Sequence, residues 1–174
     1  MSKIAYDLTR IQAVVFDVDG VLSCSTIPLD DNGLPRRTVN IKDGYALQLA
    51  VKRGLKIAII TGAVSPGINE RYHSLGVRDI FCGASQKLPV LRKWMEDNGL
   101  QPEHVAYAGD DIPDYECMMY AGLSVAPADA AIEIARIAGY NSPVEGGHGV
   151  ARDLLEEIMR AQGIWALDAD AFGW

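Results

Sequence analysis

The feature that most constrains the fold is a repeated alternation of short apolar runs with amphipathic stretches that end in glycine. The apolar runs are rich in β-branched residues and occupy residues 13–16, 57–60, 79–82, 105–108 and 123–125. Most of them are continuously apolar rather than alternating. They therefore predict strands buried on both faces of a parallel sheet.

Helical spacing of apolar residues marks the stretches between these runs: 44–53, 68–75, 87–98, 115–121, 129–137 and 150–162. A glycine follows each stretch closely, as is common where helices end. This order predicts an α/β fold, a doubly wound parallel sheet forming a single domain over residues 1–174. Sheets of this kind bind ligands at the carboxyl ends of their strands.

Two segments depart from the repeat. Residues 23–42 contain Asn32-Gly33 between β-prone runs, which predicts a β-hairpin insertion. The C-terminal tail, about residues 164–174, carries Trp165, Phe172 and Trp174. Such aromatic residues are unusual in a disordered tail, so we expect the tail to dock on a neighbouring subunit.

Composition excludes several classes of function. A net charge of −7 without a basic run argues against a nucleic-acid partner. No apolar run reaches the roughly 18 residues of a membrane span, and residues 1–10 lack a signal-peptide core. Cys24, Cys82 and Cys117 form neither a disulfide framework nor a metal spacing, which predicts a cytoplasmic protein. An anionic substrate would need local cations or a metal ion.

Asp17 and Asp19 follow the first apolar run directly, with Gly20 behind them. Two carboxylates at a strand end can hold Mg²⁺ and leave one oxygen free to attack a substrate. A pair of this kind also occurs in calcium loops and on ordinary surfaces. Its place after a buried strand favours the catalytic interpretation.

Three further polar signals lie at the ends of later strands or at the start of the next helix. Thr61-Gly62 follows the second run, Lys87 opens a helix, and an acidic cluster holds Asp110, Asp111 and Asp114. Taken singly, each has an ordinary structural explanation: a helix cap for Thr61-Gly62, a solvated side chain for Lys87 and a solvated loop for the acidic cluster. Together they predict one crevice suited to a phosphoryl group.

The order of these motifs resembles that of the haloacid dehalogenase (HAD) superfamily, in which phosphatases carry an aspartate at the position of Asp19. Residues 40–45 (NIKDGY), 109–114 (GDDIPD), 146–149 (GGHG) and 161–163 (AQG) are similar to segments of the 3-deoxy-D-manno-octulosonate 8-phosphate (KDO 8-phosphate) phosphatases. The similarity covers nearly the whole chain. It implies a Rossmann-like HAD core without a cap domain, because the stretches between the motifs are too short for one.

The resemblance implies a mechanism. Asp17 becomes an aspartyl phosphate, Asp19 serves as acid and base, and Thr61 and Lys87 hold the phosphoryl oxygens. Mg²⁺ is held by the carboxylates of Asp17 and Asp110 and by the backbone carbonyl of Asp19. The aspartates that orient Lys87 or the metal's waters are Asp111 and Asp114.

The resemblance also implies a substrate, KDO 8-phosphate, hydrolysed in lipopolysaccharide precursor synthesis. The implied substrate-binding residues are Asp19, Asn40, Ile41, Lys42, Asp43, Gly44, Thr61, Gly62, Arg71 and Lys87. The chain departs from the family at Gln48 and Ala63, where arginine is common. Arg36 and Arg37 could supply replacement charge, but we expect both to be solvated on the hairpin.

Capless members are similar in forming homotetramers whose subunits close each other's sites, and we expect the same here through paired hairpins. Alternatives stay open. The substrate could be a nine-carbon sialic-acid-type 9-phosphate, the chain could be a phosphoacceptor signalling domain, or it could be a non-catalytic binding module. The DxDG position and the intact motifs argue against the last two.

Overall fold

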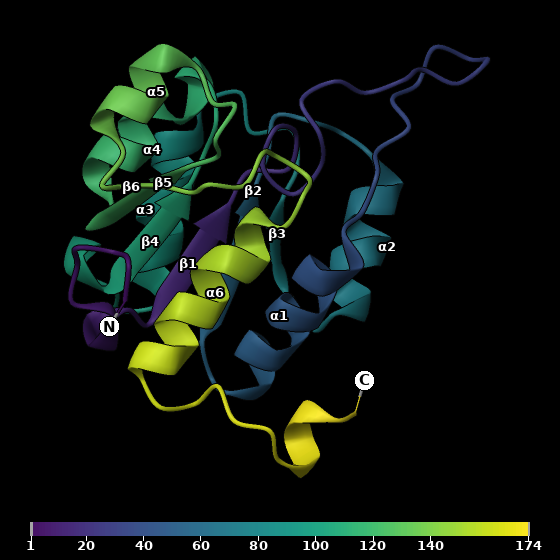
Figure 1. The fold of residues 1–174 in the computed structure, drawn as a ribbon. Coiled ribbons are helices and arrows are strands. Elements are labelled where there is room, and N and C mark those ends of the chain that lie inside the picture. Colours follow the sequence, from purple (N-terminus) through teal and green to yellow (C-terminus); the bar gives the residue numbers. More distant parts are fainter. Residues whose placement is uncertain (1, 174) are drawn as a thin grey trace.

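The computed structural model describes residues 2–173, apart from the side chain of Asp170. Six parallel strands form one sheet in the order β3-β2-β1-β4-β5-β6 (Figure 1). The strands are β1 (Ala13–Phe16), β2 (Lys56–Ile60), β3 (Asp79–Phe81), β4 (Val105–Ala108), β5 (Leu123–Ala126) and β6 (Tyr140–Asn141). The predicted doubly wound sheet is confirmed. Strand β6, which has only two residues, was not predicted.

Helices cover both faces of the sheet, as Figure 1 shows, with α1 and α6 on one face and α3, α4 and α5 on the other. The helices are α1 (Ile41–Lys52), α2 (Pro66–Ser74), α3 (Lys87–Asp97), α4 (Tyr115–Tyr120), α5 (Ile132–Ile137) and α6 (Val150–Ala161). Single 3-10 turns are η1 (Leu8–Arg10), η2 (Pro102–His104), η3 (Ile112–Asp114) and η4 (Ala169–Ala171).

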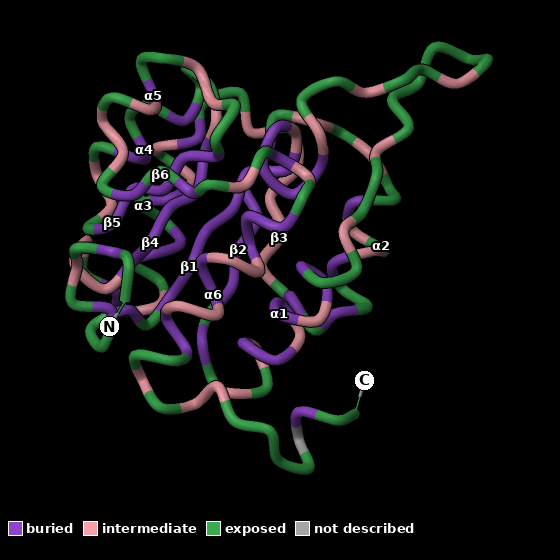
Figure 2. Tube along the Cα trace, viewed as in Figure 1, coloured by how far each residue is buried: buried purple, intermediate pink, exposed green. Residues whose placement is uncertain are grey.

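The central strands are buried on both sides (Figure 2). Val14 and Phe16 of β1 pack into the cluster beneath α1 and α6, whereas Ala13 and Val15 pack into the cluster beneath α3 and α4. Alternate residues of a strand point to opposite faces, so a continuously apolar run serves both cores. The strand ends are thereby fixed in position.

Two helices begin three residues away from the predicted start. Helix α1 begins at Ile41 rather than at residue 44, because the Asn40 side chain accepts hydrogen bonds from the Lys42 and Asp43 amides at 2.9 and 3.2 Å. Helix α5 begins at Ile132 rather than at residue 129. Asp129 instead accepts from the Gly146 amide at 2.8 Å and the Ser25 hydroxyl at 3.1 Å.

The insertion projects from the fold as a long antiparallel loop, at the upper right of Figure 1. Its turn is closed by the Asp30 amide, which donates to Leu34 O at 2.8 Å. Regular strands do not form, and Leu29 and Pro35 make only an isolated antiparallel bridge. Pro28 and Pro35 lack the N–H groups that a two-stranded ladder needs. The predicted turn is present, but the predicted regular β-hairpin is not.

The C-terminal tail folds back onto its own chain. The Tyr45 hydroxyl donates to Ala171 O and Lys52 Nζ donates to Gly173 O, both at 2.8 Å, and the Trp165 ring meets Tyr45 edge-on. We expected the tail to dock on a neighbouring subunit, but these contacts hold it against α1 of its own chain. Trp174 lies outside the described residues. Within residues 2–173, no helix is both long and apolar enough to cross a bilayer.

Candidate active site

The candidate site lies where the direction of strand order reverses. The chain passes from β1 outward to β2 and β3, then returns to β4 on the other side of β1. Asp17 directly follows β1, and its amide donates to Ala108 O at the end of β4, at 3.0 Å. Such a switch point leaves a crevice at the carboxyl ends of the strands, which is where ligands bind in this architecture.

Lys87 lies between two buried carboxylates. Its Nζ is 2.8 Å from Asp17 Oδ2 and 2.8 Å from Asp114 Oδ1. Asp17, Lys87 and Asp114 are 7%, 5% and 1% exposed, so Lys87 is not a solvated surface residue. Burial alone would lower the pKa of Lys87, but the charges of Asp17 and Asp114 outweigh it and raise the pKa. The ammonium group therefore stays charged beside Asp17.

Tyr107, in the middle of the apolar run of β4, belongs to the same network, and sequence reasoning missed it. Its hydroxyl donates to Asp114 Oδ1 at 2.7 Å, while the Asp110 amide donates to Asp114 Oδ2 at 3.1 Å. Both oxygens of Asp114 are thus fixed. The one available signal was a hydroxyl in a strand otherwise free of polar side chains, since a buried hydroxyl usually has a partner.

The carboxylate cluster could hold a metal ion. Ligand oxygens of Asp17, Asp110 and Asp114 lie within 4.8 Å of one another. Burial, with the charges of neighbouring carboxylates, raises the pKa of Asp17 to about 6 and that of Asp110 to about 7. Crowded hard oxygen donors of this kind fit a divalent cation such as Mg²⁺. Asp114, predicted only as a supporting residue, is as near as the predicted ligands.

Gly20 and Asp111 shape the same pocket. A Cβ added to Gly20 would lie 1.9 Å from Asp110 Oδ2, so the glycine of DxDG makes room for Asp110. Asp111 is exposed, and its carboxylate accepts from the Ile112 amide at 2.8 Å. Asp111 caps η3 rather than contacting Lys87. The pocket has a volume of about 310 Å³ and is lined by acidic residues that include Asp17, Asp19 and Asp110.

Asp19 is engaged by the insertion loop. Arg37 Nε and Nη2 donate to Asp19 Oδ1 and Oδ2 at 2.7 and 2.8 Å. The Arg37 side chain is 15% exposed, so the expectation that it is solvated was wrong. The loop folds back far enough to bring its guanidinium group to the carboxylate that follows the strand.

Thr61 and Gly62 lie at the same edge of the sheet, at the end of β2. Thr61 is buried; its amide donates to Phe81 O at 2.9 Å and its Oγ1 accepts from the Ala63 amide at 3.2 Å. The turn after Thr61 leads into α2, whose first residues line a second cavity. The predicted phosphoryl-binding role of Thr61 and Gly62 stays a prediction.

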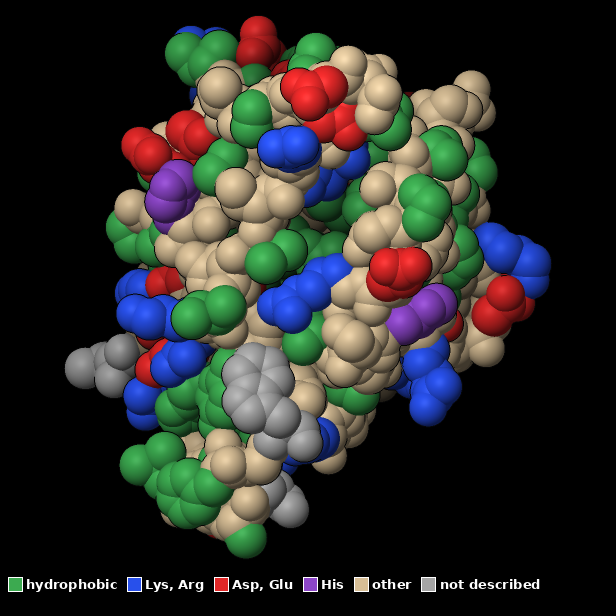
Figure 3. Space-filling view, turned by 90° about the vertical axis from the view of Figure 1, so that its right-hand side faces the viewer, with side chains coloured by type: hydrophobic (Ala, Val, Ile, Leu, Met, Phe, Trp, Pro, Cys, Tyr) green, Lys and Arg blue, Asp and Glu red, His purple; other side chains and the backbone are tan. Residues whose placement is uncertain are grey.

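The second cavity, of about 230 Å³, lies between the insertion loop and α2. Arg37 and Arg71 both line it. Figure 3 looks onto this side of the molecule and shows Lys and Arg side chains set into a hollow among hydrophobic ones. A Cβ at Gly44 would lie 2.5 Å from Arg71 Nη2, so this glycine leaves space for the guanidinium group.

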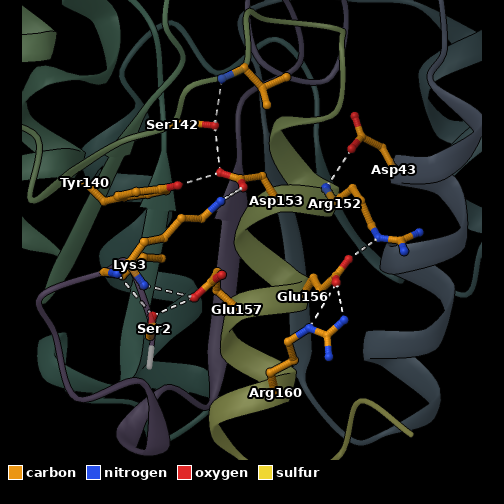
Figure 4. Close-up of polar contacts among 12 residues, drawn as sticks. Ser2, Lys3, Asp43, Tyr140, Ser142, Arg152, Asp153, Glu156, Glu157 and Arg160 are labelled. Carbon is orange, nitrogen blue, oxygen red and sulfur yellow. Dashed lines mark hydrogen bonds and ion pairs between the residues drawn. The ribbon is translucent and has the colours of Figure 1, made fainter. Parts of the chain in front are cut away.

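Residues 40–43 are apart from the acidic pocket. Asn40 caps α1, Ile41 is 72% exposed, and Lys42 lines a different hollow beside α6. Asp43 is buried, and its Oδ1 accepts from the Arg152 amide at 2.7 Å, as Figure 4 shows. In this structure Asp43 thus ties α1 to the first turn of α6, which is a structural contact. Its predicted role in substrate binding stays a prediction.

No protein-family model matches the chain. The chain is 37% identical over 154 residues to 3-deoxy-D-manno-octulosonate 8-phosphate phosphatase KdsC of Escherichia coli (strain K12). The aligned part covers 88% of this chain and 82% of that protein.

Two solved structures show the same fold. The cobalt-bound deoxy-D-mannose-octulosonate 8-phosphate phosphatase of Haemophilus influenzae matches with a TM-score of 0.88 at 30% identity, covering 95% of this chain and 98% of that one. The Moraxella catarrhalis 3-deoxy-D-manno-octulosonate 8-phosphate phosphatase, in complex with magnesium, phosphate and KDO, matches with a TM-score of 0.86 at 30% identity. That match covers 90% of each chain.

Proposed function

Because the chain belongs to the KDO 8-phosphate phosphatase family of the HAD superfamily, we propose that it hydrolyses KDO 8-phosphate to KDO and phosphate with Mg²⁺ as cofactor. The observation that carries the proposal is the buried contact between Asp17 and Lys87 at the carboxyl edge of the sheet, beside two further carboxylates. A fixed carboxylate next to a fixed cation is what attack on a phosphate ester requires.

The residues divide the reaction between them. An oxygen of Asp17 forms a bond to phosphorus while the bond from phosphorus to the sugar oxygen breaks, and Asp19 gives a proton to that oxygen. Water then attacks the aspartyl phosphate, Asp19 takes a proton from it, and inorganic phosphate leaves. Asp19 must turn away from Arg37 to act in either step.

In this proposal Lys87 and Thr61 donate to the phosphoryl oxygens, and the contacts of Asp114 with Lys87 and Tyr107 keep Lys87 in place. Asp17 and Asp110 would hold the metal ion, with Asp114 beside them. When bound, Mg²⁺ neutralises phosphoryl charge that would otherwise repel an attacking carboxylate. The described residues thus provide both the nucleophile and its electrostatic support.

The test is phosphate release by the purified protein across a panel of esters, with Mg²⁺ and after EDTA treatment. We expect turnover of KDO 8-phosphate that EDTA abolishes and Mg²⁺ restores. Preference for a nine-carbon sialic-acid-type 9-phosphate would move the substrate assignment within the sugar-acid phosphates. No metal-dependent phosphate release from any ester would overturn the proposal.

We also propose a homotetramer in which a neighbour completes each site. The loop that follows Asp17 exposes Leu29 and Leu34 at 63% and 62%, an apolar surface that pairing would cover. Sedimentation velocity is the test: one species near the 18.9 kDa chain mass with full activity would contradict it. The free cysteines Cys24, Cys82 and Cys117 support action in the reducing cytoplasm, which cell fractionation would check.

A further inference from the structure

The cavity between the insertion loop and α2 is cationic. Its polar lining includes Arg37, Thr38, Ser65 and Arg71, and no carboxylate lines it within the described part of the chain. The first turn of α2 borders it as well, and the N-terminal end of a helix favours negative charge. The chemistry of the cavity therefore suits a small anion.

Arg71 is not fully satisfied in this cavity. Its Nε is buried and has no hydrogen-bond partner among the residues that the structure describes. An unpaired buried donor is costly, and guanidinium groups match the geometry of carboxylates. A carboxylate in the cavity would give Arg71 the acceptor that it lacks.

Arg37 joins this cavity to the acidic pocket. It lines the cavity, yet its guanidinium donates to both oxygens of Asp19. While this contact holds, both Asp19 oxygens accept from the guanidinium group, which competes with the leaving oxygen of a substrate for Asp19. Arg37 lies on a loop with a single isolated bridge, so it can turn without unfolding a regular element.

We propose that Arg37 makes the enzyme selective for phosphate esters that carry a carboxylate, a step that rests on the proposed function. A substrate carboxylate between Arg37 and Arg71 accepts from Arg37 in place of Asp19. Two guanidinium groups would hold the carboxylate, whereas Arg37 alone holds Asp19, so the exchange favours the bound carboxylate. Asp19 is then free to face the sugar oxygen. An ester without a carboxylate must break the pair of Arg37 with Asp19 and gains nothing in return.

The test compares the wild type with Arg37→Met and with Arg36→Met. Arg36 is exposed on the same loop and has no ion pair among the described residues, so its variant is the matched control. Four substrates separate the effects. KDO 8-phosphate and 3-phosphoglycerate carry a carboxylate, glucose 6-phosphate does not, and p-nitrophenyl phosphate needs no proton on its leaving group.

We expect Arg37→Met to lower kcat/KM for KDO 8-phosphate about 10- to 100-fold, the loss of a charged hydrogen-bonded contact. It should raise kcat for glucose 6-phosphate roughly several-fold, because the variant no longer has to break the contact of Arg37 with Asp19. Turnover of p-nitrophenyl phosphate, which carries no carboxylate and still needs Asp19 for the attack of water, should not fall, and Arg36→Met should match the wild type on all four esters. An equal fall on every ester, or unchanged preference, would overturn the proposal.

Titration with free KDO separates this inference from the proposed function, because it needs no turnover. We expect Arg37→Met to weaken KDO binding while Arg36→Met does not. If KDO 8-phosphate is not hydrolysed but 3-phosphoglycerate is preferred over glucose 6-phosphate through Arg37, the proposed substrate fails and the inference stands. If KDO 8-phosphate is hydrolysed equally by the wild type and Arg37→Met, the inference fails and the proposed function stands.

Discussion

The corner around Asp17 and the insertion loop that reaches it are built in opposite ways. Asp17, Lys87 and Asp114 come from three separate segments and are almost fully buried, and Lys87 Nζ lies 2.8 Å from an oxygen of each carboxylate. The loop is largely exposed and makes one isolated bridge between its two arms. The sheet and helices fix the corner, whereas the loop can change without disturbing them. In our proposals the corner carries the chemistry, and the loop tunes access to Asp19.

The two regions also differ in how much stability is lost when one partner of a charged pair is removed. Lys87 is stable in the interior only because Asp17 and Asp114 both contact it, and removing one member leaves an unpaired buried charge. Arg37 and Asp19 are partly exposed, so solvent can replace either partner. Substitutions in the corner should therefore affect folding and turnover together, and those in the loop should affect selectivity.

The largest expected effect follows from Asp17→Asn. An amide cannot attack phosphorus, so we expect turnover to fall at least about a thousandfold with the fold retained. The control is Asp31→Asn, an exposed acidic residue at the tip of the loop. Steady-state phosphate release with Mg²⁺ measures both variants. Near-wild-type turnover by Asp17→Asn would show that Asp17 does not take part in the reaction.

Lys87→Met sharpens the comparison through stability. It leaves Asp17 and Asp114 facing each other without a cation, so we expect the free energy of unfolding to fall by about 3–5 kcal/mol. Urea denaturation in metal-free buffer measures this. Lys93→Met, on the solvent face of the same helix, should leave the midpoint unchanged. Equal effects of the two variants would contradict the account of a buried, fixed corner.

Asp43→Asn tests a buried carboxylate outside the corner. Burial raises the pKa of Asp43 to about 6 from an ordinary 3.8, so the folded state binds this proton more tightly than the unfolded state. Wild-type stability should therefore fall as pH rises from about 4 to about 6, by up to about 3 kcal/mol from this group.

Asn at position 43 can still accept from the Arg152 amide but cannot ionise, so the variant should lack this fall. Urea midpoints measured for both proteins across that pH range, with Mg²⁺ present, give the difference. A parallel pH dependence in the two proteins would contradict the assignment. An unchanged KM would mark Asp43 as structural, and a raised KM would support its predicted role in substrate binding.

Tyr107→Phe gives the smallest effect. It removes one hydrogen bond to Asp114 and leaves Lys87 in place, so we expect a loss of about 1 kcal/mol in stability. Turnover should fall by less than about tenfold, since Lys87 and the Asp110 amide still hold Asp114. Denaturation and kinetics on the same preparation measure both. A loss as large as that of Lys87→Met would show that the network depends on Tyr107 more than its geometry indicates.

The sequence predicted those parts of the fold that follow from periodicity. Continuous apolar runs and glycine stops indicated five of the strands, and the sheet's connectivity then required Asp17 and the acidic cluster after β4 to meet at one edge. Motif order was therefore enough to predict that Lys87, Asp110 and Asp114 gather near Asp17, because the ends of parallel strands converge at one edge of the sheet.

Features set by tertiary contact were not predictable in this way. The start of α1 depends on where the Asn40 side chain caps, and the pairing of Arg37 with Asp19 depends on the path of a loop without regular strands. Tyr107 was hidden within an apolar run. The tail was expected to contact another subunit because nothing local in its sequence shows that α1 offers it hydrogen-bond partners.

The central claim is that Asp17 forms a covalent aspartyl phosphate. The most direct measurement is rapid acid quenching of the wild type during turnover of KDO 8-phosphate carrying a radiolabelled phosphate group, with Mg²⁺ present. The account predicts label on the denatured protein within the first turnover, released by hydroxylamine and located at Asp17. Asp17→Asn should carry none. Rapid phosphate release by the wild type with no protein-bound label at any quench time would contradict it.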